Sequence, residues 1–170
     1  GNKKDANSYR PVAINPLPGK CYEAILLDRL QNHLKKNNVI NKNQFGFTKG
    51  SNTEVATVHL LSEVYNNIDK KCFTSVLFLD LTKAFDCISH DILVGKLRKL
   101  QIPPLFLNIL ISYLSDRFQY VEINETKSAK LPVYDGVFQG SKLAACLFIV
   151  YINNIFSLPL RGKLILYADD

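Results

Sequence analysis

The sequence has 170 residues, of which 47% are hydrophobic and 21% are charged. These values are ordinary for one globular domain with its own core, and they exclude a disordered chain. The formal net charge of +6 permits a nucleic-acid partner without proving one. The longest apolar run, Leu143 to Ile152, is shorter than the roughly 20 residues that a membrane helix needs. We therefore expect no membrane partner.

Four cysteines, Cys21, Cys72, Cys87 and Cys146, stand far apart, with no C-x-x-C pair and no histidine at metal-ligand spacing. This pattern disfavours a zinc site or a disulfide framework and favours packed thiols in a reducing compartment. The sequence also contains no methionine and stops at a pair of aspartates. We therefore expect a fragment, with further chain missing after Asp170.

The N-terminal part is predicted to hold extended chain and two helices. Residues 3–18 are polar and proline-rich, which favours extended chain with turns. Apolar residues recur at helical spacing over 20–36. Ser51 to Glu54 has capping-box spacing and opens a second helix over 52–68. We expect both helices to face the core, the second one through Val55, Val58, Leu61, Tyr65 and Ile68.

The C-terminal part is predicted to be mixed. The expected elements are a buried strand at 73–80, helices at 89–100 and 104–115, a hairpin at 118–134 that turns at Asn124-Glu125, a buried helix at 142–155 and a last strand at 163–167. This order predicts an α+β fold, a split β-α-β arrangement in which a ferredoxin-like mixed sheet carries helices on one face.

Carboxylates follow both predicted strands. The apolar run 76–79 leads into Asp80, and the run 164–166 leads through Tyr-Ala into Asp169 and Asp170. Neighbouring strands end about 4.8 Å apart, so these carboxylates could share two divalent ions about 3.5–4 Å apart. Magnesium is the natural ion for such oxygen ligands. A single strand-end aspartate is often only a turn former, but the three together favour a two-metal site for phosphoryl transfer.

Five stretches resemble the sequence blocks of one enzyme family. In chain order they are Ser8-Tyr9-Arg10-Pro11-Val12, Asn43-Gln44-Phe45-Gly46-Phe47, Phe78-Leu79-Asp80-Leu81-Thr82-Lys83-Ala84-Phe85-Asp86, Gly136-Val137-Phe138-Gln139-Gly140-Ser141-Lys142-Leu143 and Tyr167-Ala168-Asp169-Asp170. Together they resemble reverse transcriptases, most closely those of jockey-like non-LTR retrotransposons. Each block alone is weak evidence, but five in family order over nearly the whole chain are highly specific.

The resemblance implies a fold and an activity. The fold would be the fingers (1–72) and a truncated palm (73–170) of a reverse transcriptase, with a finger-side hairpin near 116–135 and no thumb. The activity would be RNA-directed DNA polymerisation, in which the 3′-hydroxyl of a DNA primer attacks a dNTP on an RNA template with two Mg²⁺ ions, or Mn²⁺ as the alternative. The implied partners include the rest of the retrotransposon polyprotein, with its endonuclease and thumb. The implied setting is intracellular, in a cytoplasmic ribonucleoprotein and the nucleus.

The resemblance also assigns roles to single residues. Asp80, Asp169 and Asp170 match the catalytic, metal-binding carboxylates, and the carbonyl of Leu81 would join the metal shell. Phe85 matches the gate that excludes a 2′-hydroxyl. The residues that match nucleotide contacts are Arg10, Leu81, Phe85, Gln139 and Gly140. Those that match template or primer contacts are Phe45, Gly46, Phe47 and Tyr167.

Plain structural roles are the alternative for several of these residues. Phe85 could be a core aromatic, the glycines around Gln139 could mark only a strand-to-helix turn, and the Phe45–Phe47 loop could be packed on the core. Arg10 could be merely exposed. Asp86 is interpreted as a cap or polar anchor of the following helix.

Four places depart from the family pattern, and none is a catalytic carboxylate: Thr48, Phe138, Ala144-Ala145-Cys146 and Asn154. The pattern suits a divergent working lineage or a degenerate genomic copy. A non-catalytic nucleic-acid-binding remnant is therefore the alternative function. A maturase-like splicing cofactor is a third alternative, which no feature of the sequence favours.

Overall fold

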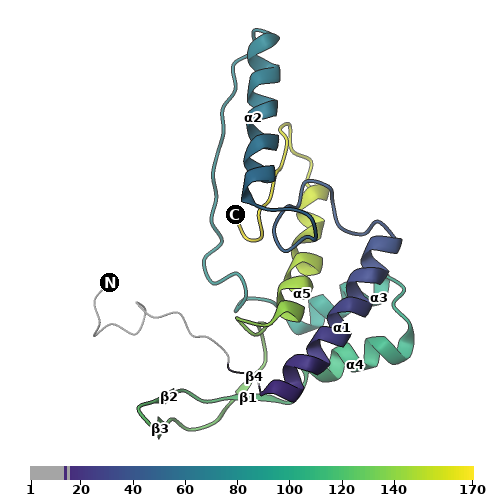
Figure 1. The fold of residues 1–170 in the computed structure, drawn as a ribbon, viewed down its shortest axis with the longest axis vertical. Helices are drawn as coiled ribbons and strands as arrows, with labels where there is room; N and C mark the ends of the chain where they lie inside the picture. The colour runs from purple at the N-terminus through teal and green to yellow at the C-terminus, as the bar shows by residue number, and fades with distance from the viewer. Residues whose placement is uncertain (1–13, 15) are drawn as a thin grey trace.

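The computed structural model describes residue 14 and residues 16–170. Five α-helices and two small antiparallel sheets make up the regular structure of this part of the chain (Figure 1). In chain order the elements are α1 (Leu17–Lys36), α2 (Thr53–Asp69), α3 (His90–Lys99), α4 (Pro104–Leu114), β1 (Arg117–Gln119), β2 (Glu122–Ile123), β3 (Thr126–Lys127), β4 (Leu131–Val133), α5 (Lys142–Ile152) and the 3₁₀ helix η2 (Asn153–Ser157).

The core lies around α5. Eight consecutive residues of this helix, 143–150, are buried, as its almost purely apolar sequence predicts. Helices α1 and α3 pack against α5, and α4 packs against α3. Helix α1 contributes Leu26, Leu30 and Leu34, which follow one another at four-residue spacing on one face. The predicted helices over 20–36, 89–100, 104–115 and 142–155 are thus confirmed, with shifts at their ends.

Helix α2 is confirmed as an element, but its predicted burial is wrong. It projects away from the cluster of the other four helices (Figure 1). It has no buried residue. Its cap also differs from the prediction, because the Asn52 side chain, not Ser51, accepts from the amide of Val55 at 2.9 Å. The apolar face expected in the core is exposed throughout, at Val55, Val58, Leu61, Tyr65 and Ile68.

The hairpin is confirmed where it was predicted. Strand β1 pairs with β4 and β2 pairs with β3, both antiparallel. Asn124 and Glu125 form the turn with φ of 46° and 66°, the left-handed conformation that tight hairpin turns require. Pro132 lies in β4, in a sheet of only two strands, where its missing N–H is tolerated.

The predicted strands at 73–80 and 163–167 are not formed, and the expected ferredoxin-like sheet is therefore absent from the described residues. Residues 72–81 run as an extended, exposed segment back from the far end of α2 (Figure 1). Residue Leu166 makes only one isolated parallel bridge, to Gln44. A strand exists only as part of a hydrogen-bonded ladder, and an apolar strand needs cover on both faces. No described residue pairs with residues 72–81 in a ladder, and none covers their apolar side chains.

Truncation of a core residue in α5 should test this architecture. Leu147 is fully buried, so Leu147→Ala leaves a cavity that the neighbouring helices cannot fill. We expect a loss of about 2–5 kcal/mol in the free energy of unfolding, measured by urea titration. Leu160 is half exposed, so Leu160→Ala is the matched control and should change stability by less than about 0.5 kcal/mol. Equal losses in the two variants would contradict the placement of α5.

The cysteines should divide into three reactive thiols and one unreactive thiol. Cys21, Cys72 and Cys87 are exposed, whereas Cys146 is buried in α5. Burial raises the pKa of the Cys146 thiol to about 12. At pH 8 only about one in ten thousand of these thiols is then ionised, and the thiolate is the reactive form. A disulfide reagent should titrate three thiols rapidly in the native protein and the fourth only in guanidinium. Four rapid thiols without denaturant would contradict the buried position.

Candidate metal and nucleic-acid site

Residues 167–170 form a tight turn. The amide of Tyr167 donates to the carbonyl of Asp170 at 2.9 Å, and the amide of Asp170 donates to the carbonyl of Tyr167 at 3.1 Å. Ala168 has a φ of +61° and is 5% exposed. This left-handed conformation is unfavourable for alanine, so surrounding contacts must hold it. The turn presents two adjacent carboxylates, a half-buried one at Asp169 and an exposed one at Asp170.

The loop before α2 lies beside this turn. The amide of Phe45 donates to the carbonyl of Leu166 at 2.8 Å, and the amide of Leu166 donates to the carbonyl of Asn43 at 2.9 Å. The Asn43 side chain donates to the carbonyl of Leu164 at 3.1 Å. The second block of the sequence is therefore hydrogen-bonded to the chain that leads directly into the fifth block, although more than 100 residues separate them.

The buried side chain of Gln44 makes the closest link between loop and turn. Its Oε1 accepts from the amides of Gly46 at 2.8 Å and Ala168 at 3.0 Å, and its Nε2 lies 3.4 Å from the Ala168 carbonyl. Gly46 packs directly on Ala168. A Cβ at Gly46 would lie 2.6 Å from the Cα of Ala168 and closer still to its nitrogen. Only glycine allows this approach.

The predicted template residues differ in their accessibility. Phe45 is buried, and its ring lies 5.4 Å from that of His59 on α2. Gly46 is covered by the turn. Phe47 is 52% exposed and meets Phe85 edge-on at 6.0 Å. Of the three, Phe47 therefore offers a free aromatic face, and Tyr167 lies half-buried in the turn itself.

Three of the predicted nucleotide residues, Phe85, Gln139 and Gly140, lie at one junction. The amide of Val137 donates to the carbonyl of Phe85 at 2.9 Å, and the amide of Gly136 donates to the carbonyl of Ile88 at 2.8 Å. Gly136 has a φ of +85°, and a Cβ there would meet Asp86 at 3.0 Å. These bonds join the stretch after Asp80 to the turn before α5. The Phe85 ring also stacks on Phe148 of α5 with centroids 4.8 Å apart.

Asp86 does not cap the following helix, so its interpretation as a cap is wrong. The N-cap of α3 is Ser89, without a side-chain hydrogen bond. Asp86 Oδ1 instead accepts from Nε2 of Gln139 at 3.0 Å. The carboxylate thus orients the carboxamide of the residue expected to touch a nucleotide. Gly140 follows with a φ of +108°, which lets the chain turn into α5.

A buried polar cluster fixes the start of α5. The carboxylate of Glu23 on α1 accepts from Tyr113 at 3.0 Å and from Ser141 at 2.7 Å. The Ser141 hydroxyl in turn accepts from the amide of Ala144 at 3.2 Å and so caps α5. Burial raises the pKa of the Tyr113 hydroxyl well above its usual range. This cluster holds the end of the Gln139 turn to α1 and α4.

The three predicted carboxylates are not brought together. Asp80 is exposed on the extended segment, as is Leu81. Among residue 14 and residues 16–170, no group of three or more histidine, cysteine, aspartate or glutamate side chains could hold a metal ion. Carboxylate and carbonyl oxygens suit Mg²⁺, so the donor types fit that ion, but their arrangement does not converge. Arg10 lies outside the described residues.

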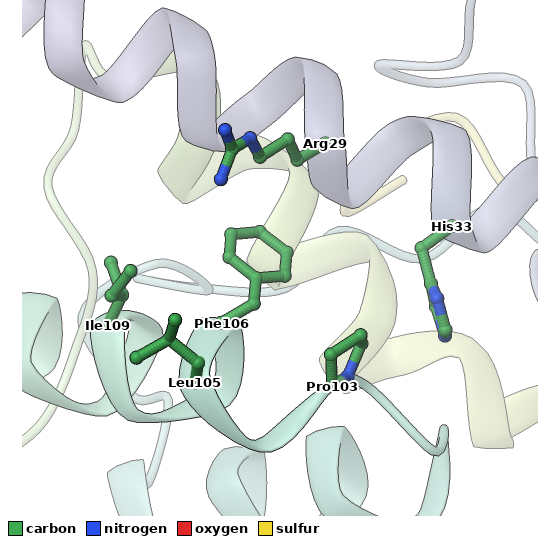
Figure 2. A pocket seen from close by; sticks show the side chains of 6 residues that line it. All are labelled: Arg29, His33, Pro103, Leu105, Phe106 and Ile109. Carbon is green, nitrogen blue, oxygen red and sulfur yellow. The ribbon is translucent and has the colours of Figure 1, made fainter.

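One pocket of about 360 Å³ lies elsewhere, between α1 and α4 (Figure 2). In Figure 2 the guanidinium of Arg29 lies above the ring of Phe106, and His33 extends from α1 on the side of Pro103. The His33 ring nitrogen Nε2 is hydrogen-bonded to the Leu100 carbonyl at 2.8 Å. The pocket is lined mainly by apolar side chains, holds no carboxylate and contains none of the predicted site residues. No helix in the described part of the chain is both long and apolar enough to cross a membrane.

The sequence analysis gave no role of its own to Gln44, because the functional interpretation of the second block rested on the neighbouring aromatic residues. Asp86 was interpreted as a cap or polar anchor of the following helix, and its hydrogen bond to Gln139 was not predicted. The clue for Gln44 was its place directly before a Phe-Gly pair in a loop, since a buried amide beside a close backbone approach must find partners. No spacing rule could name those partners.

Comparison with known proteins supports the family resemblance of the five sequence blocks. The model of the family "Reverse transcriptase (RNA-dependent DNA polymerase)" matches residues 2–170. The chain is 32% identical over 151 residues to the RNA-directed DNA polymerase from the mobile element jockey of Drosophila melanogaster, covering 89% of this chain and 16% of that protein. It is 29% identical over 175 residues to the probable RNA-directed DNA polymerase from transposon BS of the same fly, covering 99% of this chain.

A third relative is the probable RNA-directed DNA polymerase from transposon X-element of the same fly, 28% identical over 172 residues. The chain spans 19% of the length of the BS and X-element proteins. The family model covers nearly the whole chain, however. The chain therefore belongs to the reverse transcriptase family, and it is related to the enzymes of non-LTR retrotransposons.

Proposed function

We propose that this chain is the fingers (1–72) and part of the palm (73–170) of an RNA-directed DNA polymerase from a mobile element. It would join a dNTP to the 3′-hydroxyl of a DNA primer along an RNA template. The observation that carries the proposal is the hydrogen-bonded Tyr167–Asp170 turn, which presents two adjacent carboxylates in a chain that matches the family over 2–170. Paired carboxylates on a fixed turn suit metal-assisted phosphoryl transfer.

In this proposal Asp80, Asp169, Asp170 and the carbonyl of Leu81 hold two Mg²⁺ ions, or Mn²⁺. Such ions, when bound, neutralise charge on the reacting phosphate. The support differs between the residues. Asp169 and Asp170 are fixed by the turn, whereas Asp80 enters on sequence pattern alone, because its segment has neither a partner strand nor cover in the described residues.

The nucleotide would bind at the junction of Phe85 and Gln139, with Gly140 allowing close approach and Arg10 near the triphosphate. The stacked Phe85 ring is held by α5 and meets Phe47, so that a base or sugar would meet an aromatic wall. Phe47, Phe45, Gly46 and Tyr167 would form the template side. An exposed ring there can stack on an unpaired base.

The proposed partners are the RNA template, the DNA primer, the dNTP and the remaining polyprotein, including an endonuclease and a thumb. The net charge of +6 favours phosphate backbones. The polymerase would work inside the cell, in a cytoplasmic ribonucleoprotein and in the nucleus.

A second candidate is a nucleic-acid-binding remnant without catalysis. One observation favours it. The described residues assemble no set of three metal-binding side chains, and Asp80 lies exposed on an unpaired segment. In that case the basic charge and Phe47 would still support binding, but no nucleotide would be incorporated.

Primer extension distinguishes the two candidates. We expect a C-terminally extended form of this chain to extend oligo(dT) on poly(rA) with Mg²⁺ and dTTP. Asp169→Asn removes one metal-binding charge and should lower the rate by at least about 100-fold, more than the loss of an outer-shell partner. Asp116 is exposed and lies outside the site, so Asp116→Asn should leave the rate unchanged. Template binding without any incorporation by the extended form would favour the remnant.

The Asp86–Gln139 hydrogen bond should affect nucleotide affinity. Asp86→Ala frees the Gln139 carboxamide and is expected to raise the KM for dTTP about 2- to 10-fold, the usual worth of one hydrogen bond. Asp86→Asn keeps an acceptor oxygen at the same place and should stay closer to the parent enzyme. Steady-state kinetics in dTTP give the comparison. An Asp86→Ala enzyme with unchanged KM would show that this contact does not prepare the nucleotide site.

A further inference from the structure

We propose that Gln44 is a positioning residue for the carboxylate turn and that Gly46 is its necessary companion. The inference rests on the proposed function, since the turn is taken as the metal-binding element. Gln44 is 3% exposed and lies in a loop that is 124 residues from Ala168 in sequence. Its side chain approaches both the N–H and the C=O of that one residue.

The chemistry of the position selects glutamine. Ala168 offers an N–H that needs an acceptor and a C=O that needs a donor, and both face the same side chain. A carboxamide supplies both groups, whereas a carboxylate supplies only acceptors and a thioether supplies neither in useful strength. The same Oε1 also accepts from Gly46 at 2.8 Å. One side chain thereby fixes the loop and the turn together.

The contact also compensates for backbone strain. Ala168 has a φ of +61°, which a non-glycine residue keeps only where its surroundings hold it. Ala168 directly precedes Asp169, and Gln44 contacts the peptide on each side of Ala168. Its Oε1 accepts from the N–H of the Tyr167–Ala168 peptide at 3.0 Å, and its Nε2 lies 3.4 Å from the carbonyl of the Ala168–Asp169 peptide, which leads into that carboxylate. Metal ligands work only when held to within about 0.5 Å of their place. Gln44 is suited to give this order without touching a metal or a substrate.

Gly46 supports the same role by sterics. A Cβ there would overlap the backbone of Ala168, and the turn would have to move. Gly95 in α3 is a matched site, because a Cβ added there meets nothing within 4 Å. Gln119 on β1 is exposed and far along the chain from both elements, so it is the matched control for Gln44.

The first test needs no catalysis. Amide hydrogen exchange is measured in this chain for the parent, Gln44→Met and Gln119→Met. Gln44→Met keeps the length of the side chain and removes its hydrogen bonds, so the amides of Gly46 and Ala168 should exchange roughly 3- to 10-fold faster. The amides of α5 should keep their protection in both variants. Unchanged exchange at Ala168 would overturn the inference, whether or not the enzyme polymerises.

The second test asks whether the held turn matters for the site. In the C-terminally extended form, Mn²⁺ binding followed by electron paramagnetic resonance should weaken about 10- to 100-fold in Gln44→Met and Gly46→Ala, the usual effect of losing a group that orients metal ligands. In primer extension kcat should fall while the KM for dTTP stays within about twofold. Gly95→Ala and Gln119→Met should match the parent in both assays.

The outcomes separate the two proposals. A parent that binds Mn²⁺ but incorporates no nucleotide would overturn the polymerase function and leave Gln44 as a residue that orders the turn. Faster exchange at Ala168 with unchanged Mn²⁺ binding would overturn the positioning role. A loss of activity matched by an equal fall in the protection of α5 would mean general unfolding and would also overturn it.

Discussion

The burial of α5 is the constraint on which the rest of the structure depends, because both ends of this helix hold loops that carry candidate site residues. At its start, Ser141 caps the helix and links it to Glu23 and Tyr113, and the Gln139 turn is fixed just before this point. At its end, Asn153 donates to the carbonyl of Val39 at 2.8 Å and accepts from the amide of Asn41 at 3.0 Å. Hydrophobic burial sets the position of the helix, and the hydrogen bonds at its two ends position the loops beside it.

The link from the end of α5 to the carboxylates passes through side-chain amides. Asn153 holds Asn41, the Asn41 side chain accepts from the amide of Asn43 at 2.9 Å, and Gln44 holds the Ala168 turn. Irregular chain cannot satisfy its own backbone groups as a helix does, so buried loops need such partners. Asparagine and glutamine suit the task because each offers a donor and an acceptor. The Tyr167–Asp170 turn is therefore ordered without any sheet.

Local sequence patterns could predict the helices and the hairpin, because their signals lie within a few residues: four-residue leucine spacing in α1, the continuous apolar run of α5, and Asn124-Glu125 between two short strands. The strand at 73–80 could not be predicted reliably, since its existence depends on a partner far along the chain. The predicted burial of the apolar face of α2 was wrong for the same reason. Periodicity shows which side of a helix is apolar but not what covers that side. Of the two helices expected to face the core, α1 is covered by α5, whereas α2 has no buried residue.

The carboxylates of the candidate site differ in the same way, according to whether their position depends on nearby contacts or on a distant partner. Its aspartate pair rests on short-range turn bonds and on Gln44, so it is formed in the described residues. Asp80 depends on a segment whose Phe73, Leu77, Phe78 and Leu79 are all more than 60% exposed. Burying one such side chain is worth about 1.5–3 kcal/mol, so any surface that covered this segment would be strongly favoured and would also fix Asp80. In the proposed function, catalysis therefore depends on the pairing of residues 73–80, whereas the Tyr167–Asp170 turn is already formed.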